Sequence, residues 1–160
     1  MLYTIDNTFD DIQSKVVVDL GCGGGILGIG SSILGSGMTI GIDIDPSAIE
    51  IAKRNADEME VENIEFLLAD IPSMDIRHHN KKQLADTVIM NPPFGTKNAG
   101  IDLKFVEKAL QICSGAVYSL HKSSTRSFLQ KKAKELGVEA QVLAQLRWDI
   151  PQMYKFHGAR

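Results

Sequence analysis

The chain has 160 residues, with 44% hydrophobic and 23% charged residues, which is typical of one soluble globular domain with a sizeable core. Its formal net charge of −3 argues against a free-standing basic nucleic-acid binder, so any RNA contact must come from a local patch or a partner. No window reaches the roughly 18 apolar residues of a membrane helix. Cys22 and Cys113 lack metal-ligand spacing and are too few for a disulfide scaffold, which predicts a reduced intracellular compartment.

Strand and helix signals alternate along the chain. Apolar, β-branched runs predict six strands, at residues 15–20, 38–44, 63–68, 85–90, 116–120 and 138–148. Helical spacing and cap residues predict four helices, at residues 26–34, 47–59, 102–112 and 124–136. This alternation predicts an α/β fold with a mostly parallel sheet and right-handed crossovers. No repeat or long linker divides the chain, so we expect residues 1–160 to form a single domain.

A glycine cluster follows the first predicted strand and its terminal carboxylate, Asp19. Glycines let the backbone approach a ligand closely and adopt positive φ. Asp43 ends the second strand, where a carboxylate can accept both ribose hydroxyls, and Asp70 follows the third, placed for an adenine amino group. This set suits a cationic amine, a ribose and an adenine, and so predicts S-adenosylmethionine as cofactor; its members are Asp19, Gly21, Gly23, Gly24, Asp43 and Asp70.

This cluster also matches two other interpretations. Residues 23–28 match the dinucleotide fingerprint G-x-G-x-x-G, although the match is weak in so glycine-rich a stretch. A dinucleotide would place its pyrophosphate at the helix amino end, close to the negative charge of Asp19. Alternatively, the glycines only make a tight turn and the aspartates only cap helices. The ordered set of glycines and aspartates favours S-adenosylmethionine over both.

Asn91-Pro92-Pro93-Phe94 follows the fourth predicted strand and therefore lies where open α/β sheets bind ligands. The Asn91 side-chain oxygen and the Pro92 carbonyl can accept the two hydrogens of a planar amino group, and these bonds strengthen as charge develops on its nitrogen. Prolines fix φ before the substrate arrives, and Phe94 offers a stacking face. These four residues are the predicted catalytic residues. The motif leaves the substrate open among adenine, other exocyclic amines and protein glutamine amides.

Four segments resemble the methyltransferase-like protein 5 family, whose members are N6-adenosine ribosomal RNA methyltransferases. They are residues 19–23, 91–98 and 116–124, and the run Tyr154-Lys155-Phe156-His157. The third of these segments contains His121-Lys122-Ser123-Ser124. The resemblance implies a Rossmann-like class I S-adenosylmethionine-dependent methyltransferase with helices on both faces of the sheet. It also implies N6 methylation of one adenosine in 18S small-subunit rRNA, a heterodimer with a small methyltransferase-activator protein, and a nuclear, nucleolar and cytoplasmic location.

The resemblance also implies site residues and missing segments. Gly21, Gly24, Asp43 and Asp70 would hold the cofactor, and Asn91 to Phe94 the adenine. The family has an amino-terminal segment with a Leu-Glu-Gln-Tyr-Pro-Thr-like motif and a further strand after the Tyr-Lys-Phe-His run. We therefore expect this chain to be truncated at both ends and to lack the final strand.

Lys97 and Lys122 follow strand ends on the predicted active-site side, and we expect both to contact RNA phosphate. The apolar third strand, residues 64–68, should lie at a sheet edge, where the activator protein could add a strand. Two other functions stay open: a non-catalytic fragment or binding module that retains the fold, and a protein-glutamine N5 methyltransferase.

Overall fold

The structure is a computed structural model that describes residues 1–74, 83–93 and 100–146. Two compact units are present, Met1–Lys122 and Ser123–Arg160, and each is described by itself. The first unit holds the strands β1 (Val16–Leu20), β2 (Met38–Asp43), β3 (Ile64–Leu68), β4 (Ala85–Met90) and β5 (Cys113–Ser119). Its longer helices are α2 (Ile26–Ile33), α3 (Pro46–Glu58) and α4 (Ile101–Ile112), and a short 3-10 turn, η2, spans Ile71–Ser73.

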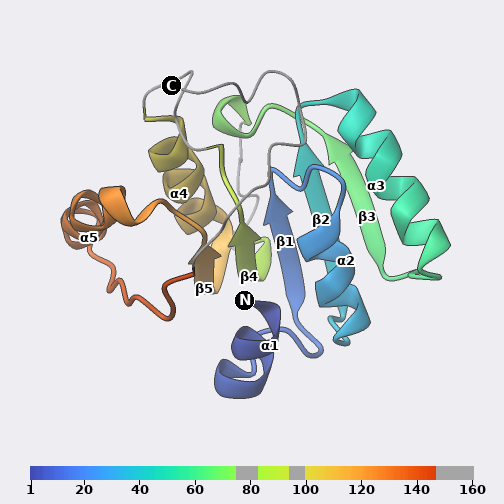
Figure 1. Cartoon of the computed structure of the whole chain (residues 1–160), viewed down its shortest axis with the longest axis horizontal. Coiled ribbons are helices and arrows are strands. Elements are labelled where there is room, and N and C mark those ends of the chain that lie inside the picture. Colours follow the sequence, from blue (N-terminus) through green and yellow to red (C-terminus); the bar gives the residue numbers. More distant parts are fainter. Residues whose placement is uncertain (75–82, 94–99, 147–160) are drawn as a thin grey trace. The chain divides into compact units, whose positions relative to one another are not determined.

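The five strands form one parallel sheet in the order β3-β2-β1-β4-β5 (Figure 1). β1 is central and pairs with β2 on one side and β4 on the other. β3 is an edge strand of the described sheet, as predicted. The parallel α/β sheet expected from the alternating pattern is confirmed.

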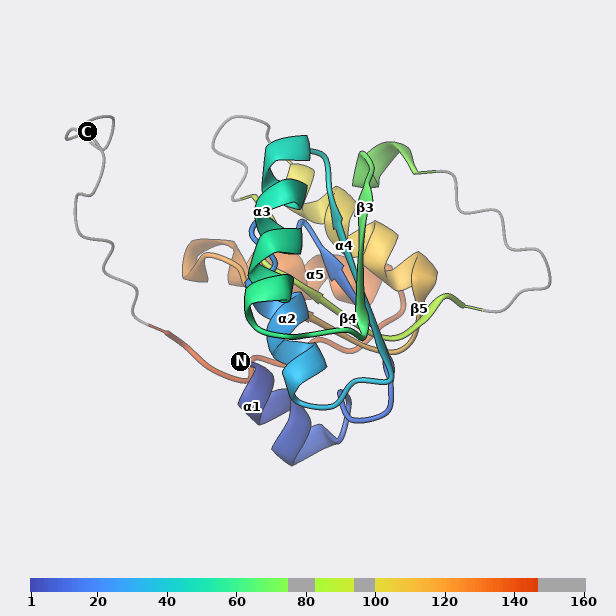
Figure 2. The same ribbon diagram turned by 90° about the vertical axis from the view of Figure 1, so that its right-hand side faces the viewer.

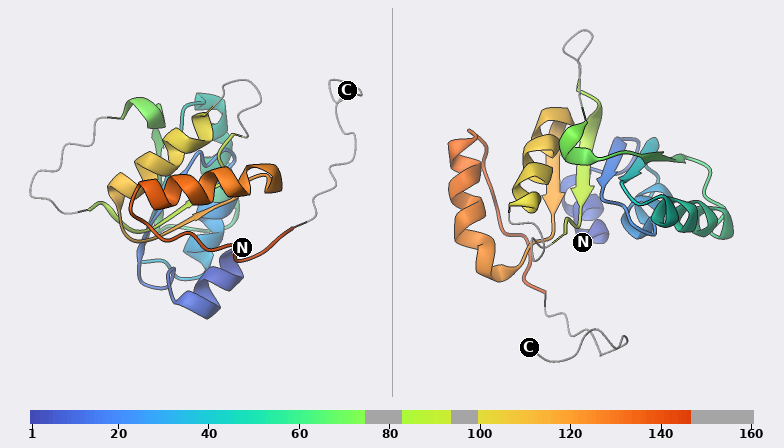
Figure 3. Two further views of the ribbon diagram at one scale, coloured as in Figure 1. Left: turned by 90° about the vertical axis from the view of Figure 1, so that its left-hand side faces the viewer. Right: turned by 90° about the horizontal axis from the view of Figure 1, so that it is seen from above.

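Helices cover both faces of this sheet, which also confirms the prediction (Figures 2 and 3). α4 packs Phe105, Ala109 and Ile112 against strand residues that include Val18, Leu20, Val88 and Met90. On the other face, α2 and α3 pack against β3, where Ile29, Ile49 and Ala52 meet Phe66. The alternation of side chains along β1 explains this division, because Val18 and Leu20 point to one face and Val17 and Asp19 to the other.

The predicted helices and strands of the first unit are found within three residues of their expected bounds. At the start of α3, Asp45 accepts a hydrogen bond from the Ser47 amide (2.9 Å), and Pro46 is the first helical residue, as expected of a capped helix. β5 begins at Cys113, three residues earlier than predicted. The predicted β4 bounds match the observed strand.

An amino-terminal segment that the sequence patterns did not reveal supports the other end of the sheet. It contains α1 (Leu2–Thr4) and a π-helical turn, η1 (Ile5–Phe9). Ile5 and Ile12 are fully buried against Val17 and Ile89. The Asp11 backbone carbonyl accepts a hydrogen bond from the Thr87 hydroxyl (2.6 Å). These contacts lie away from the carboxyl ends of the strands, so this segment stabilises the opposite end of the sheet (Figure 1).

The second unit contains a 3-10 turn, η3 (Ser123–Thr125), and α5 (Arg126–Glu135); two residues after this helix, Gly137 has a φ of +75°. The predicted sixth strand is wrong for residues 138–146, which form neither strand nor helix. Their alternating apolar side chains remain exposed, at 38% for Val138, 45% for Val142 and 60% for Leu146. A strand pattern needs a sheet to pair with, and the described residues of this unit provide none.

Packing around Gly41 in β2 predicts a strict size limit. A Cβ atom there would lie 2.7 Å from Phe66 Cδ1 and 3.1 Å from Cys22 Sγ. We expect Gly41→Ala to lower the free energy of unfolding by about 1–3 kcal/mol, as overpacking of a core does. Urea unfolding measures this loss. Because Phe66→Leu removes the ring that clashes, the double variant should lose less than the sum of the two single losses, and strict additivity would contradict the clash.

Candidate active site

The candidate site lies at the carboxyl ends of the strands, where the sheet order reverses between β1 and β4. Leu20 pairs with Ile42 of β2 and with Met90 of β4. Gly21 follows Leu20, Asp43 follows Ile42 and Asn91 follows Met90. The register therefore brings the three predicted segments to the same level. Open α/β sheets bind ligands at such a switch point.

The glycine loop turns sharply after β1. The amides of Gly21 and Cys22 both donate to the Ile42 carbonyl, at 2.8 and 3.0 Å. Gly25 has a φ of +85°, and a Cβ there would meet Ala52 and Ile29 at 3.1 Å. Gly23 also has a positive φ, but a Cβ there would meet nothing within 4 Å. The loop is therefore closely packed beneath Gly25 and open at Gly23, where a ligand can approach the backbone.

Asp43 ties the end of β2 to this loop. Its Oδ2 accepts a hydrogen bond from the Gly23 amide (2.8 Å), and its Oδ1 accepts one from the Asp45 amide (3.0 Å). Two backbone bonds fix the orientation of the carboxylate. A carboxylate has about four acceptor positions, so capacity for ribose hydroxyls remains.

Asp19 lies under α2 and is 1% exposed. Its Oδ2 accepts a hydrogen bond from the Gly28 amide (2.9 Å), whereas its buried Oδ1 has no partner among the described residues. Burial raises the pKa of Asp19 from 3.8 to about 7; the Gly28 hydrogen bond opposes this shift, and the charge of Asp43 adds to it. At neutral pH this carboxyl is therefore only partly ionised, and a cationic ligand nearby would favour its ionised form.

Asp70 lies farther along the same edge of the sheet. It is exposed, and its carboxylate accepts a hydrogen bond from the Ser73 hydroxyl in η2. The neighbouring Ala69 amide donates to the Asp43 carbonyl (2.9 Å), which connects this segment to the end of β2. The described contacts thus connect the predicted cofactor residues. Asp43 bonds directly to Gly23, and Asp19 bonds to Gly28 in the helix that follows the same loop. Asp70 is connected to Asp43 through the backbone of its neighbour Ala69.

The Asn91 turn leaves β4 on the other side of the switch point. Met90 and Pro92 are fully buried, whereas Asn91 and Pro93 are exposed. The buried ring of Pro92 anchors the turn while the Asn91 side chain lies at the surface. Phe94 and Lys97 lie outside the described residues, so their predicted roles stay predictions.

Comparison with known proteins shows the family to which this chain belongs. The family profile described as ribosomal protein L11 methyltransferase (PrmA) matches residues 2–92. The rRNA N(6)-adenosine-methyltransferase METTL5 of Danio rerio is 52% identical over 158 residues, which cover 98% of this chain and 75% of the relative. The Drosophila melanogaster protein of the same description, Mettl5, is 46% identical over 98% of this chain and 73% of its own length.

The chain belongs to the METTL5 family of rRNA N(6)-adenosine methyltransferases. Among solved structures, PH1948 of Pyrococcus horikoshii, described as a candidate RNA methyltransferase, matches with a TM-score of 0.82 at 32% identity. That match covers 98% of this chain and 73% of PH1948. The family and the methyltransferase fold predicted from the sequence are both confirmed.

His121 lies in the METTL5-family site, but the sequence pointed to it only within the His-Lys-Ser-Ser resemblance and assigned it no role. The Leu120 amide donates to the Met90 carbonyl (3.1 Å), which brings the end of β5 beside the Asn91 turn. His121 Nε2 lies 2.8 Å from the Ser119 hydroxyl, and its Nδ1 lies 3.9 Å from an Asp102 carboxylate oxygen at the start of α4. Burial lowers the pKa of His121, and Asp102 opposes that shift. Its position directly after a predicted strand was the available signal.

The remaining predicted or excluded site residues can also be placed. Lys122 is exposed and follows β5 within the first unit, and its contact with RNA stays a prediction. Cys22 is buried in the loop, where burial together with Asp19 and Asp43 raises its pKa to about 12, so its thiol is unreactive. The described residues contain no cluster of three metal-ligating side chains. Among them, no helix is both long and apolar enough to cross a membrane.

The buried carboxyl of Asp19 predicts a pH-dependent stability. Below about pH 4 it is protonated in both the folded and the unfolded chain. As the pH rises to about 7, Asp19 ionises first in the unfolded chain, so the free energy of unfolding falls by up to about 4 kcal/mol. The side chain of Asp19→Asn cannot ionise. The free energy of unfolding of this variant, measured with urea, should therefore fall less over the same pH range than that of the wild type. Parallel curves for the two proteins would contradict the assigned pKa.

Proposed function

We propose that this chain methylates the N6 amino group of an adenosine in 18S small-subunit rRNA, using S-adenosylmethionine. The observation that carries the proposal is the exposed Asn91 beside buried Pro92, at the switch point opposite the glycine loop. Membership of the METTL5 family supports rRNA as the substrate and the adenine N6 as the acceptor.

The residues opposite Asn91 fit the cofactor. S-adenosylmethionine supplies a methyl group on a sulfonium cation. Gly23 offers open backbone, Asp43 has acceptor capacity for the ribose, and exposed Asp70 can accept from the adenine amine. Asp19 adds negative charge beneath the loop, with one oxygen that lacks a described partner. A bound cation would lower the pKa of Asp19, so ligand binding should offset part of its burial cost.

The Asn91 turn acts on the acceptor amine. The amide oxygen of Asn91 and the carbonyl of Pro92 accept the two N6 hydrogens, which orients the nitrogen lone pair toward the donor. These hydrogen bonds strengthen as positive charge develops on the nitrogen, so they stabilise the transition state more than the ground state. Once methylated, the cationic nitrogen is acidic and would release one of its two protons to solvent. Buried Pro92 holds its carbonyl in place before the substrate binds. Phe94 would provide the stacking face for the adenine.

A protein acceptor, such as a glutamine side chain, has weaker support than rRNA. The L11 methyltransferase profile ends at residue 92, and so stops before α4, β5 and the segment after β5. The METTL5 relatives match 98% of the chain and thus extend through the substrate side. The same continuity, together with the exposed Asn91, favours an enzyme over a non-catalytic binding module.

The proposal includes two contacts with partners. Lys122, directly after the end of β5, would contact rRNA phosphate, as Lys97 would from the loop after the Asn91 turn. A small activator protein would add a strand to the β3 edge. Leu67 and Leu68 at this edge are 50% and 58% exposed, which leaves apolar surface for a partner strand to cover.

We expect Asn91→Ala to lower kcat for small-subunit rRNA about 10²–10³-fold, the range observed when one transition-state hydrogen-bonding group is removed. The measurement is methyl transfer from labelled S-adenosylmethionine by each protein together with the activator. Because Asn91 is exposed, the variant should keep its fold and its affinity for S-adenosylmethionine, which calorimetry checks. A rate equal to that of the wild type would refute the assigned role.

The β3 edge can be tested through its backbone. Thr39 donates to the Asn63 carbonyl and Ala69 to the Asp43 carbonyl, so by the alternation of a parallel ladder the Leu68 N–H points away from β2. Proline is tolerated at such an edge position. We therefore expect Leu68→Pro to reduce co-purification of the activator, whereas Leu68→Ala keeps the N–H and most of the binding.

Phe66 is unsuited to this test, because it is buried against Gly25 and Gly41. A Leu68→Pro chain that co-purifies with the activator as well as the wild type does would contradict strand addition at β3.

A further inference from the structure

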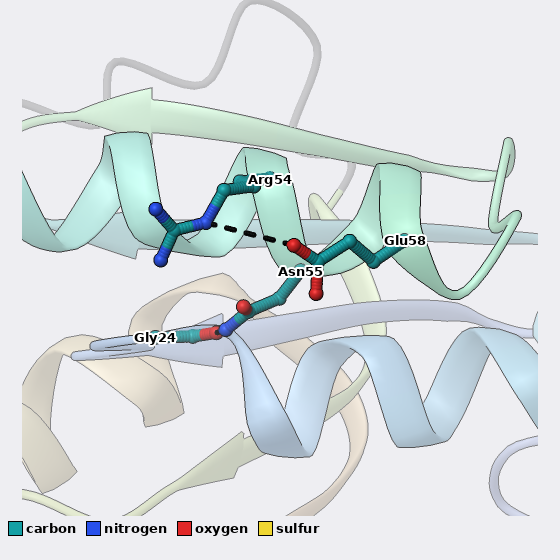
Figure 4. A network of polar contacts seen from close by, with 4 residues as sticks. All are labelled: Gly24, Arg54, Asn55 and Glu58. Carbon is teal, nitrogen blue, oxygen red and sulfur yellow. Dashed lines mark hydrogen bonds and ion pairs between the residues drawn. The ribbon is translucent and has the colours of Figure 1, made fainter.

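Asn55 on α3 contacts the glycine loop across a separation of 31 residues. Its Nδ2 donates to the Gly24 carbonyl at 2.8 Å (Figure 4). The adjacent Arg54 points elsewhere and forms an ion pair with Glu58 at 3.8 Å, where both side chains are 68% exposed. Of these two neighbouring polar residues, Asn55 is the one that reaches the loop.

The helix itself gains little from an asparagine at this position. Asparagine has lower helix propensity than alanine, because its side chain competes for nearby backbone groups in non-helical conformations. Here the amide group is directed away from its own helix and to a carbonyl of another segment. The contact with Gly24 therefore explains the residue better than the stability of α3 does.

The loop is held on its other side by the strand that leads into α3. Asp43 accepts a hydrogen bond from the Gly23 amide, and its second oxygen accepts one from Asp45, the cap of α3. Asp43 and Asn55 thus belong to one continuous segment that holds two consecutive loop residues, one by its N–H and the next by its C=O. Without the second contact, the loop would rely on glycines whose backbone freedom is large.

We infer that Asn55 is a positioning residue that orders the glycine loop before S-adenosylmethionine binds. This role rests on the proposed function, because it assigns that cofactor to the loop. Ordering the loop in advance lowers the entropy lost on binding, so its effect appears in cofactor affinity. The methyl acceptor contacts the Asn91 turn instead, so the rate at saturating cofactor depends little on Asn55.

The test compares Asn55→Ala and Asn55→Asp with the matched control Arg54→Ala. Calorimetry with S-adenosylmethionine should give a Kd raised about fivefold or more for Asn55→Ala, the size expected for one hydrogen bond. Asn55→Asp is nearly isosteric but cannot donate, so its Kd should rise at least as much. Arg54→Ala should bind like the wild type. In the methyl-transfer assay, Asn55→Ala should raise the KM for S-adenosylmethionine and leave kcat within about twofold.

Two measurements without ligand keep the inference testable. Alanine is the better helix former, so the Tm of Asn55→Ala should not fall. Hydrogen exchange at the Gly23 to Gly25 amides should be faster in this variant than in Arg54→Ala. Wild-type affinity together with unchanged exchange would overturn the role of Asn55. If the wild-type chain shows no binding of S-adenosylmethionine, the proposed function fails, and the exchange rates alone then decide whether Asn55 orders the loop.

Discussion

The parallel pairing of β1 with both β2 and β4 is the constraint on which the site depends. Leu20 is opposite Ile42 on one side and Met90 on the other, so three connections leave the sheet at one level. Parallel strands end together at one edge, and the reversal of strand order beside β1 leaves the glycine loop and the Asn91 turn on either side of the switch point. A one-residue slip at either pairing would turn the ends of β2 or β4 to the wrong face.

The glycine loop after β1 and the carboxylate before it are groups that cost stability. Asp19 is buried with one oxygen that lacks a described partner, and Gly21, Gly23 and Gly25 have positive φ. The surrounding structure holds them through bonds to Ile42, Gly28 and Asp43. Such a combination is typical of functional sites, where the surrounding fold offsets locally unfavourable groups. The continuous segment from the end of β2 through α3 contributes both Asp43 and Asn55, and so holds the glycine loop at Gly23 and at Gly24.

The two edges of the described sheet differ in what they offer. β3 alternates buried Ile64 and Phe66 with exposed Glu65 and Leu67, and exposed Leu68 follows. Its inner face belongs to the core beneath α2 and α3, while on its outer side no other described strand pairs with its backbone. The end of β5 instead lies beside the Asn91 turn through the Leu120 to Met90 bond, with His121 held between Ser119 and Asp102. Partner binding at β3 and RNA binding beside β5 would therefore use different edges of the sheet.

Local patterns were sufficient for most of the fold. Apolar β-branched runs gave β4 with its observed bounds, and Asp45-Pro46 marked the start of α3, because strand periodicity and caps depend on neighbouring residues. The glycines after Asp19 and the Asn91-Pro92 pair were likewise recognisable, since their chemistry is local. The same reasoning failed at residues 138–146, where an alternating pattern has no strand partner in the described unit.

By itself, then, the sequence determined the five strands of the described sheet, the capped start of α3 and the family. Only the tertiary structure decided that Asp19 is buried and its carboxyl pKa raised, that His121 lies beside the Asn91 turn, and that Asn55 bonds to Gly24. Each of these depends on contacts between residues distant in the chain. Burial, long-range hydrogen bonds and charge interactions are set by the packing of α2, α3 and β5 on the sheet, and no local pattern encodes that packing.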